Sequence, residues 1–170
     1  MSTSGLPAAN TATPPMVIAL IAHDAKKHEL AKWAQAQHAW LMGKRLVATR
    51  STARVVTEST GLPVDSVESG PLGGDQQIGA LVSTGQVTCL VFFWDPLGVH
   101  PHAHDVYALL RLATLYDVPT ATNPATAHAL ADSRFPSRMP QPGRLQNHDD
   151  PVTGPGSRRE RLGTYRTTHP

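Results

Sequence analysis

Short apolar runs alternate with longer amphipathic stretches through most of the chain. The first run, VIALIA at residues 17–22, is wholly apolar, which is typical of a strand buried on both faces of a parallel sheet. The stretch 25–41 that follows places Leu30, Trp33 and Ala34 three and four residues apart, which favours an amphipathic helix. The two stretches together predict one strand followed by one helix.

The same strand-then-helix unit recurs four more times. The further predicted strands are RLVAT at 45–49, VDSVES at 64–69, TCLVFF at 88–93 and VPTAT at 118–122. The helices predicted after them pass through Arg54 to Val56, begin near Asp75, and cover about 104–116 and 125–132. Five such units predict an α/β fold: a three-layer α/β/α, doubly wound, mainly parallel five-stranded sheet.

The two ends of the chain differ from this periodic part. Residues 1–15 are mostly Ser, Thr, Ala and Pro without periodicity, so we expect a disordered N-terminal arm. Residues 136–170 carry six of the 15 prolines and few apolar residues, so we expect a flexible Arg- and Pro-rich C-terminal tail. One folded domain is therefore expected over residues 16–135.

Charge is unevenly distributed along the 170 residues. Residues 1–133 hold eight basic and ten acidic side chains, whereas 134–170 hold seven arginines and three acidic residues, so the net charge of +2 originates in the tail. Arg158, Arg159 and Arg161 could bind phosphate or nucleic acid, but a solvated tail is the preferred interpretation, and we expect no nucleic-acid partner.

The sequence also limits location and redox chemistry. No stretch approaches the ~20 apolar residues of a membrane span, and the N-terminus lacks the pattern of a secretory signal, so we expect a soluble cytoplasmic protein. The single cysteine, Cys89, excludes an internal disulfide framework and a multi-cysteine zinc site. Because it lies in an apolar run, we expect it to be buried and unreactive.

Polar residues follow four of the predicted strands, at the edge where open parallel sheets bind ligands. They are His23, Asp24 and Lys27 after the first strand, Thr49, Arg50, Ser51 and Thr52 after the second, Ser69 and Gly70 after the third, and Asp95, His100, His102, His104 and Asp105 after the fourth. Each has an alternative interpretation: the hydroxyls and Asp24 as helix caps, Asp95 as a turn residue, and Lys27 as a solvated charge.

These residue types suit a small phosphorylated ligand. Hydroxyls and amides at two helix N-termini, together with Lys27, can neutralise a phosphate dianion. In the stretch SGPLGGDQQIGALV, residues 69–82, four glycines surround one carboxylate, Asp75, which would face the rest of the ligand. A neutral imidazole such as His102 could donate to a developing oxyanion.

Other ligand classes are not favoured. The histidines of HPHAH at 100–104 alternate as metal ligands could, but no matching carboxylate or cysteine spacing supports a site, so we expect no metal. The Walker lysine motif and a G-x-G-x-x-G after a strand are both missing from the sequence, which disfavours nucleoside triphosphates and dinucleotides.

Four motifs in this order resemble the methylglyoxal synthase family: AHD-x-x-K at 22–27, SGPLGGDQQIGAL at 69–81, FFWDP at 92–96 and ALLRLAT at 108–114. The resemblance covers about 16–135. It implies a lyase that converts dihydroxyacetone phosphate to methylglyoxal and inorganic phosphate, as a bypass of glycolysis and without metal or organic cofactor. It also implies a homohexamer that phosphate inhibits allosterically.

The resemblance assigns roles position by position. Asp75 aligns with the catalytic base of the family, and His102 aligns with its active-site histidine. The remaining active-site aspartates align with Asp24, Asp95 and Asp105, and the substrate-binding residues align with His23, Lys27, Thr49, Arg50, Ser51, Thr52, Ser69 and Gly70.

The chain departs from the family pattern in three places. Arg50 stands where many members have glycine, and it could adopt a positive φ, donate to phosphate, or point to solvent. After His102 the family commonly has Asp-Pro, whereas this chain has Ala-His. An arginine that members contribute from a neighbouring subunit has only Arg158, Arg159 and Arg161 as candidates here.

Two other functions remain open. A regulatory module of the same fold would bind a phosphorylated ligand without chemistry, but it would have no need of Asp75, His102 and Asp105 together. A nucleic-acid-binding protein that uses the arginine tail is the more distant alternative.

Overall fold

The computed structural model describes residues 16–98 and 103–132. Its strands are β1 (Val17–Ala22), β2 (Arg45–Thr49), β3 (Val64–Val67), β4 (Cys89–Phe93) and β5 (Thr120–Ala121). Its α-helices are α1 (Lys27–Ala36), α2 (His38–Leu41), α3 (Arg50–Thr60), α4 (Gly74–Ser83), α5 (Ala103–Leu115) and α6 (Pro124–Ala131), and two short 3₁₀ turns are η1 (Asp24–Lys26) and η2 (Gly70–Leu72). The arm and tail expected at the two ends lie outside the described residues.

The five strands form one sheet in the order β3-β2-β1-β4-β5, and every neighbouring pair is parallel. The predicted fold class is therefore confirmed, with a fully parallel sheet in place of a mainly parallel one. β1 lies at the centre of this sheet. All six of its residues are buried, and its wholly apolar sequence suits a strand that has neighbours on both sides and helices on both faces.

Three predicted elements differ in detail. β3 ends at Val67, two residues before the end of the predicted range 64–69. The stretch 25–41 is divided among η1, α1 and α2, because Gln37 leaves helical geometry with φ −101° and ψ 18°. The last strand is two residues long, since Pro119 accepts a ladder bond from Leu90 but has no N–H to donate, and the Val118 amide bonds back to α5.

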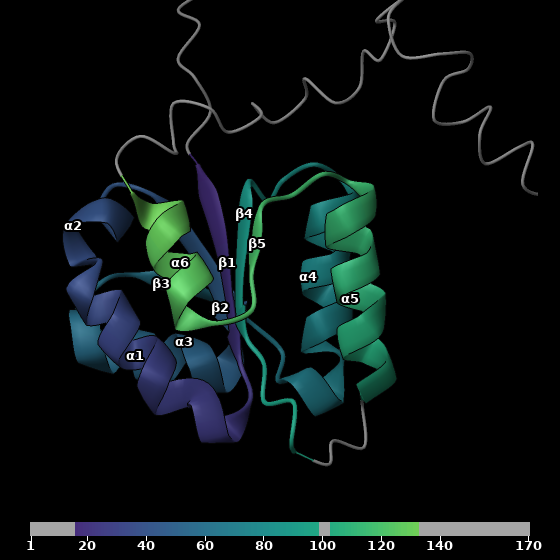
Figure 1. The fold of residues 1–170 in the computed structure, drawn as a ribbon, viewed down its shortest axis with the longest axis horizontal. Coiled ribbons are helices and arrows are strands. Elements are labelled where there is room, and N and C mark those ends of the chain that lie inside the picture. The colour runs from purple at the N-terminus through teal and green to yellow at the C-terminus, as the bar shows by residue number, and fades with distance from the viewer. Residues whose placement is uncertain (1–15, 99–102, 133–170) are drawn as a thin grey trace, which may run out of the picture.

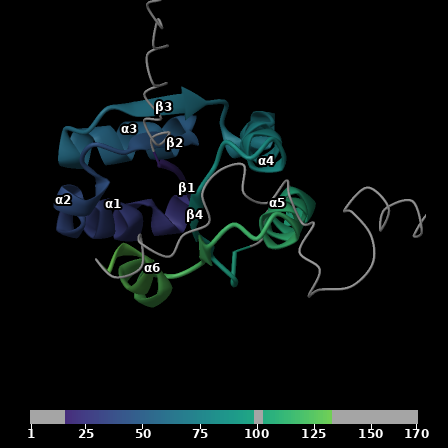
Figure 2. The same ribbon diagram turned by 90° about the horizontal axis from the view of Figure 1, so that it is seen from above.

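Helices cover both faces of the sheet (Figures 1 and 2). Alternate residues of β1 point to opposite sides: Ile18 and Leu20 pack in a core with α1, α3 and α6, whereas Ala19 and Ile21 pack in a second core with α4 and α5. Because all strands run the same way, their carboxyl ends share one edge, at the bottom of Figure 1. The chain direction across the sheet reverses beside β1, where open α/β sheets form a ligand crevice.

Cys89 is fully buried in β4, as predicted. Burial raises the pKa of its thiol to about 12, because the apolar core disfavours the thiolate. Within the part of the chain that the structure describes, no helix is long and apolar enough to cross a membrane.

Candidate functional site

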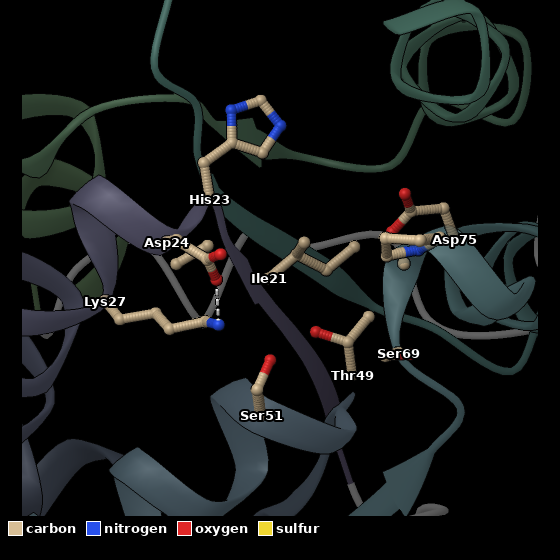
Figure 3. Close-up of a pocket in the computed structure, with 11 residues that line it drawn as sticks. Ile21, His23, Asp24, Lys27, Thr49, Ser51, Ser69 and Asp75 are labelled. Atoms are coloured by element: carbon tan, nitrogen blue, oxygen red, sulfur yellow. Dashed lines mark hydrogen bonds and ion pairs between the residues drawn. The ribbon is translucent and has the colours of Figure 1, made fainter. Parts of the chain in front are cut away.

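A small pocket opens at the carboxyl edge of β1, β2 and β3 (Figure 3). It is lined by Ile21, Ala22, His23, Asp24, Lys27, Thr49, Ser51, Ser69, Gly70, Pro71 and Asp75. Its volume, as the described residues define it, is about 100 Å³. Pockets for drug-sized ligands measure roughly 300–1,000 Å³, so this one suits a molecule of few heavy atoms.

His23 is held in one orientation at the end of β1. The Asp95 amide N–H donates to His23 Nδ1 at 3.1 Å, and the ring meets Phe92 edge-on with centroids 5.2 Å apart. Because Nδ1 accepts a hydrogen bond, the ring proton resides on Nε2. His23 is therefore set up as a neutral donor through Nε2, and Asp95 supports it through its backbone.

Lys27 supplies positive charge to the pocket. Its ammonium pairs with Asp24, and the Lys27 side chain is 18% exposed whereas that of Asp24 is 94% exposed. Figure 3 shows the ammonium on the side of the pocket where the hydroxyls of Thr49 and Ser51 lie. The interpretation of Lys27 as a fully solvated charge is therefore wrong.

The start of α3 brings hydroxyls to the same side. Thr49 stands at the N-cap position, but its hydroxyl donates to Thr52 Oγ1 at 3.0 Å in place of bonding the helix amides. Thr52 also accepts from the Ala22 amide at 3.3 Å and is almost completely buried, so it ties α3 to β1 behind the pocket. Thr49 and Ser51 line the pocket, and Thr52 positions them.

The glycine-rich loop between β3 and α4 has two different steric requirements. Gly73 has a φ of +95°, which L side chains rarely adopt. A Cβ on Gly74 would lie 2.0 Å from the Glu68 carbonyl oxygen, so the first turn of α4 rests directly on the preceding backbone. This contact brings Ser69, Gly70 and Asp75 to one pocket.

Asp75 lies in the first turn of α4 and is only 4% exposed. In Figure 3 it faces the pocket from the side opposite Lys27. It also borders a second, apolar hollow between α4 and α5, which Asp105 lines with it. Asp105 is thus near Asp75 through this second hollow and is not part of the first pocket's lining.

Arg50 stands where many members of the family have glycine, and it lies at the start of α3. It begins α3 with ordinary helical backbone, since Asp117 is the one non-glycine residue of positive φ in the described chain. Its Nη2 lies 2.6 Å from Glu68 Oε1, and the side chain does not line the pocket. Of the three alternatives for Arg50, the structure excludes a positive φ, and the side chain turns away from the pocket to pair with Glu68.

Several expected residues lie beyond what the structure describes. These are His100, His102, Arg158, Arg159 and Arg161. Across residues 16–98 and 103–132, no group of three or more His, Cys, Asp or Glu is placed to hold a metal ion. Sequence reasoning assigned no role to the lining residues Ile21, Ala22 and Pro71, although each lies within two residues of an expected site residue, His23 or Gly70.

Comparison with known proteins agrees with this fold. The family model described as "MGS-like domain" matches residues 29–122. The methylglyoxal synthase of Hahella chejuensis (strain KCTC 2396) is 51% identical over 125 residues, covering 73% of this chain and 82% of the relative. That of Rhizobium meliloti (strain 1021) is 54% identical over 118 residues, covering 69% and 94%.

A solved structure supports the same assignment. The crystal structure of methylglyoxal synthase from Elizabethkingia anophelis NUHP1 has a TM-score of 0.67 and 41% identity, covering 71% of this chain and 80% of that one. The fold and the matching family model define an α/β domain of the MGS-like class. Within that class, the chain belongs to the methylglyoxal synthase family. Relatives that carry this name at about 50% identity support a lyase activity.

Proposed function

We propose that this protein converts dihydroxyacetone phosphate to methylglyoxal and inorganic phosphate. The observation that carries the proposal is one small pocket with a lysine ammonium and two hydroxyls on one side and a buried carboxylate on the other. The ammonium and the hydroxyls suit a phosphate dianion. The carboxylate suits a proton transfer at the carbon chain that carries this phosphate.

Phosphate binding is the task of Lys27, Thr49 and Ser51. An ammonium supplies charge, and hydroxyls at the start of α3 supply directional hydrogen bonds, where the helix dipole also favours an anion. Ser69 and Gly70 complete the binding side from the end of β3.

Asp75 acts as the base. It removes a proton from the hydroxymethyl carbon, which is α to the carbonyl, and the electron pair left on carbon delocalises to give an enediolate. His102 donates to the oxygen that gains negative charge, and His23 supports it through the proton on Nε2. His23 and Asp75 both line the pocket that would hold the two ends of this three-carbon chain.

Elimination follows from the enediolate. The oxygen on the deprotonated carbon forms a carbonyl, the double bond moves to the far carbon, and the C–O bond breaks with both electrons leaving on phosphate. The resulting enol takes a proton at its terminal carbon and becomes methylglyoxal, and phosphate takes the remaining proton. The site favours elimination by holding the breaking C–O bond out of the enediolate plane. These steps use side chains alone.

The test is to incubate purified protein with dihydroxyacetone phosphate and measure methylglyoxal and phosphate together. We expect equal amounts of the two products. Glycerol 3-phosphate, which has no carbonyl to acidify a neighbouring C–H, is the matched control and should remain unchanged. Binding of dihydroxyacetone phosphate without product would instead support the ligand-sensing module.

The family resemblance extends the proposal to assembly, regulation and location. We expect a homohexamer, inhibition by inorganic phosphate, and a cytoplasmic enzyme that works without metal or organic cofactor. Light scattering measures the assembly, and initial rates at several orthophosphate concentrations measure the inhibition. Extensive dialysis against a chelator should leave the rate unchanged.

A further inference from the structure

The two-residue segment of Glu68 and Ser69, which follows β3, lies between the N-terminal parts of α3 and α4. On the α3 side, the Arg50 amide donates to the Glu68 carbonyl at 3.4 Å, and the Arg50 guanidinium pairs with the Glu68 carboxylate at 2.6 Å. On the α4 side, the Glu68 amide donates to Gln77 Oε1 at 2.7 Å, and the Gly74 amide donates to the Ser69 carbonyl at 3.0 Å. Glu68 is thus bonded to both helices.

On the α4 side, Gly74 packs directly against the backbone of Glu68 and Ser69. A Cβ on Gly74 would lie 2.0 Å from the Glu68 carbonyl oxygen and 3.0 Å from the carbonyl carbon of Ser69. The first turn of α4 therefore follows any movement of this segment.

These two helices carry the two halves of the proposed chemistry. α3 presents Ser51 on the phosphate side, α4 presents Asp75 on the proton-transfer side, and Ser69 lines the pocket between them. The attachment of Glu68 therefore determines how far Asp75 lies from the phosphate-binding hydroxyls. A base placed correctly for one carbon of a three-carbon substrate is misplaced by a shift of about 1 Å.

We propose that Glu68 is a positioning residue, which Gln77 and Arg50 hold from opposite sides and which sets the separation between Asp75 and the phosphate-binding hydroxyls. This role rests on the proposed function. The Gln77 bond is exposed too, but it is the stronger attachment, because it is a 2.7 Å bond from a backbone amide that is fixed at the end of β3. The Arg50–Glu68 pair is the weaker one, since its side chains are 64% and 38% exposed and water screens them.

The decisive variant is Gln77→Met, which keeps the shape of the side chain and removes the amide oxygen. We expect kcat for methylglyoxal formation to fall about tenfold, because misplacement of a base by a fraction of an ångström has effects of this order. The inhibition constant of orthophosphate should stay within about twofold of the unchanged protein, because Lys27, Thr49 and Ser51 belong to α1, β2 and α3. All three lie away from the α4 side that Gln77 holds.

The matched control is Gln35→Met. Gln35 Nε2 donates to the Ser59 carbonyl at 3.0 Å, so this change also removes one side-chain bond to backbone, but it does so between α1 and α3. We expect its kcat to be unchanged. Thermal midpoints of both variants report whether either loses stability.

Gln77→Glu separates the hydrogen bond from general helix packing. A carboxylate oxygen can still accept from the Glu68 amide. We therefore expect kcat of this variant to fall by less than about threefold and to remain well above kcat of Gln77→Met. Arg50→Ala should lower kcat by about twofold, and its effect should be non-additive with that of Gln77→Met, because both act on Glu68.

Three outcomes would overturn the positioning role: Gln77→Met matching Gln35→Met, Gln77→Met and Gln77→Glu being equally impaired, or kcat and orthophosphate affinity falling in parallel. An unchanged protein that forms no methylglyoxal is a different result. It overturns the proposed function itself and the positioning role with it.

Discussion

Two opposing influences meet at the Asp75 carboxylate. Burial removes water from a carboxylate and makes it a stronger base, whereas the N-terminal end of a helix stabilises its anion and makes it a weaker one. Asp75 is 4% exposed and lies in the first turn of α4. We expect a substrate that fills the pocket to remove more water and to shift this balance toward proton abstraction.

Replacing Asp75 with Asn tests the base directly. The amide fills the same space but cannot take a proton, so we expect kcat to fall by about 10²–10⁴-fold, the usual contribution of acid–base catalysis. Orthophosphate should still bind. Asp117→Asn, at an exposed residue with φ +53° that Asn also tolerates, is the control and should keep full activity. Near-normal turnover by Asp75→Asn would exclude Asp75 as the base.

Lys27→Ala tests the phosphate side. Loss of a charge-assisted hydrogen bond costs about 1.5–3 kcal/mol, so KM and the orthophosphate inhibition constant should both rise by at least about tenfold. Lys26→Ala is the neighbouring control, because Lys26 pairs with Glu29 at 3.1 Å and does not line the pocket. If orthophosphate inhibited both variants equally, Lys27 would not be a phosphate ligand.

Among the elements, the junction between the end of β3 and the start of α4 has no room for an added side chain at Gly74. Gly74→Ala places a methyl group against backbone at 2.0 Å, which cannot move aside, and we expect a loss of at least about 1–3 kcal/mol in the free energy of unfolding. Gly79→Ala in the same helix meets the flexible end of Leu112 at 3.1 Å and should change stability much less. Urea denaturation of both variants makes the comparison, and equal stability would contradict the close approach.

Sequence patterns predict elements better than they predict which way a side chain points. The bounds of β1 and β2 agree with the predicted ranges, since VIALIA is wholly apolar and RLVAT has a short apolar centre between a charged residue and a hydroxyl residue. Seven of the residues expected from the strand ends line the pocket, and Asp75, expected from the glycine-rich stretch, lines it as well. The rule for strand ends could not tell that Thr52 turns behind the pocket or that Arg50 turns to Glu68, because these orientations depend on partners distant in sequence.

On the scale of the whole molecule, Cys89 reports on the integrity of the sheet. It lies in β4, between β1 and β5, with no exposed surface and a thiol pKa of about 12. At about pH 8 the native thiol is almost entirely protonated, so a thiol reagent should react only when the sheet opens. We expect labelling to be slow in native buffer and complete in denaturant. Rapid labelling of native protein would show that the core opens locally at β4.

The order of the chain has a consequence for how the site comes into being. Among the residues that the structure describes, every one that lines the pocket lies between Ile21 and Asp75, so a ribosome has synthesised all of these before β4 exists. Yet β1, which leads into His23, Asp24 and Lys27, pairs on one side with β4. A nascent chain that ends near Gln86 would contain these pocket residues, but the edge of β1 that pairs with β4 would be unpaired. We therefore expect ligand binding only after β4 has been synthesised, although β4 itself supplies none of the described lining residues.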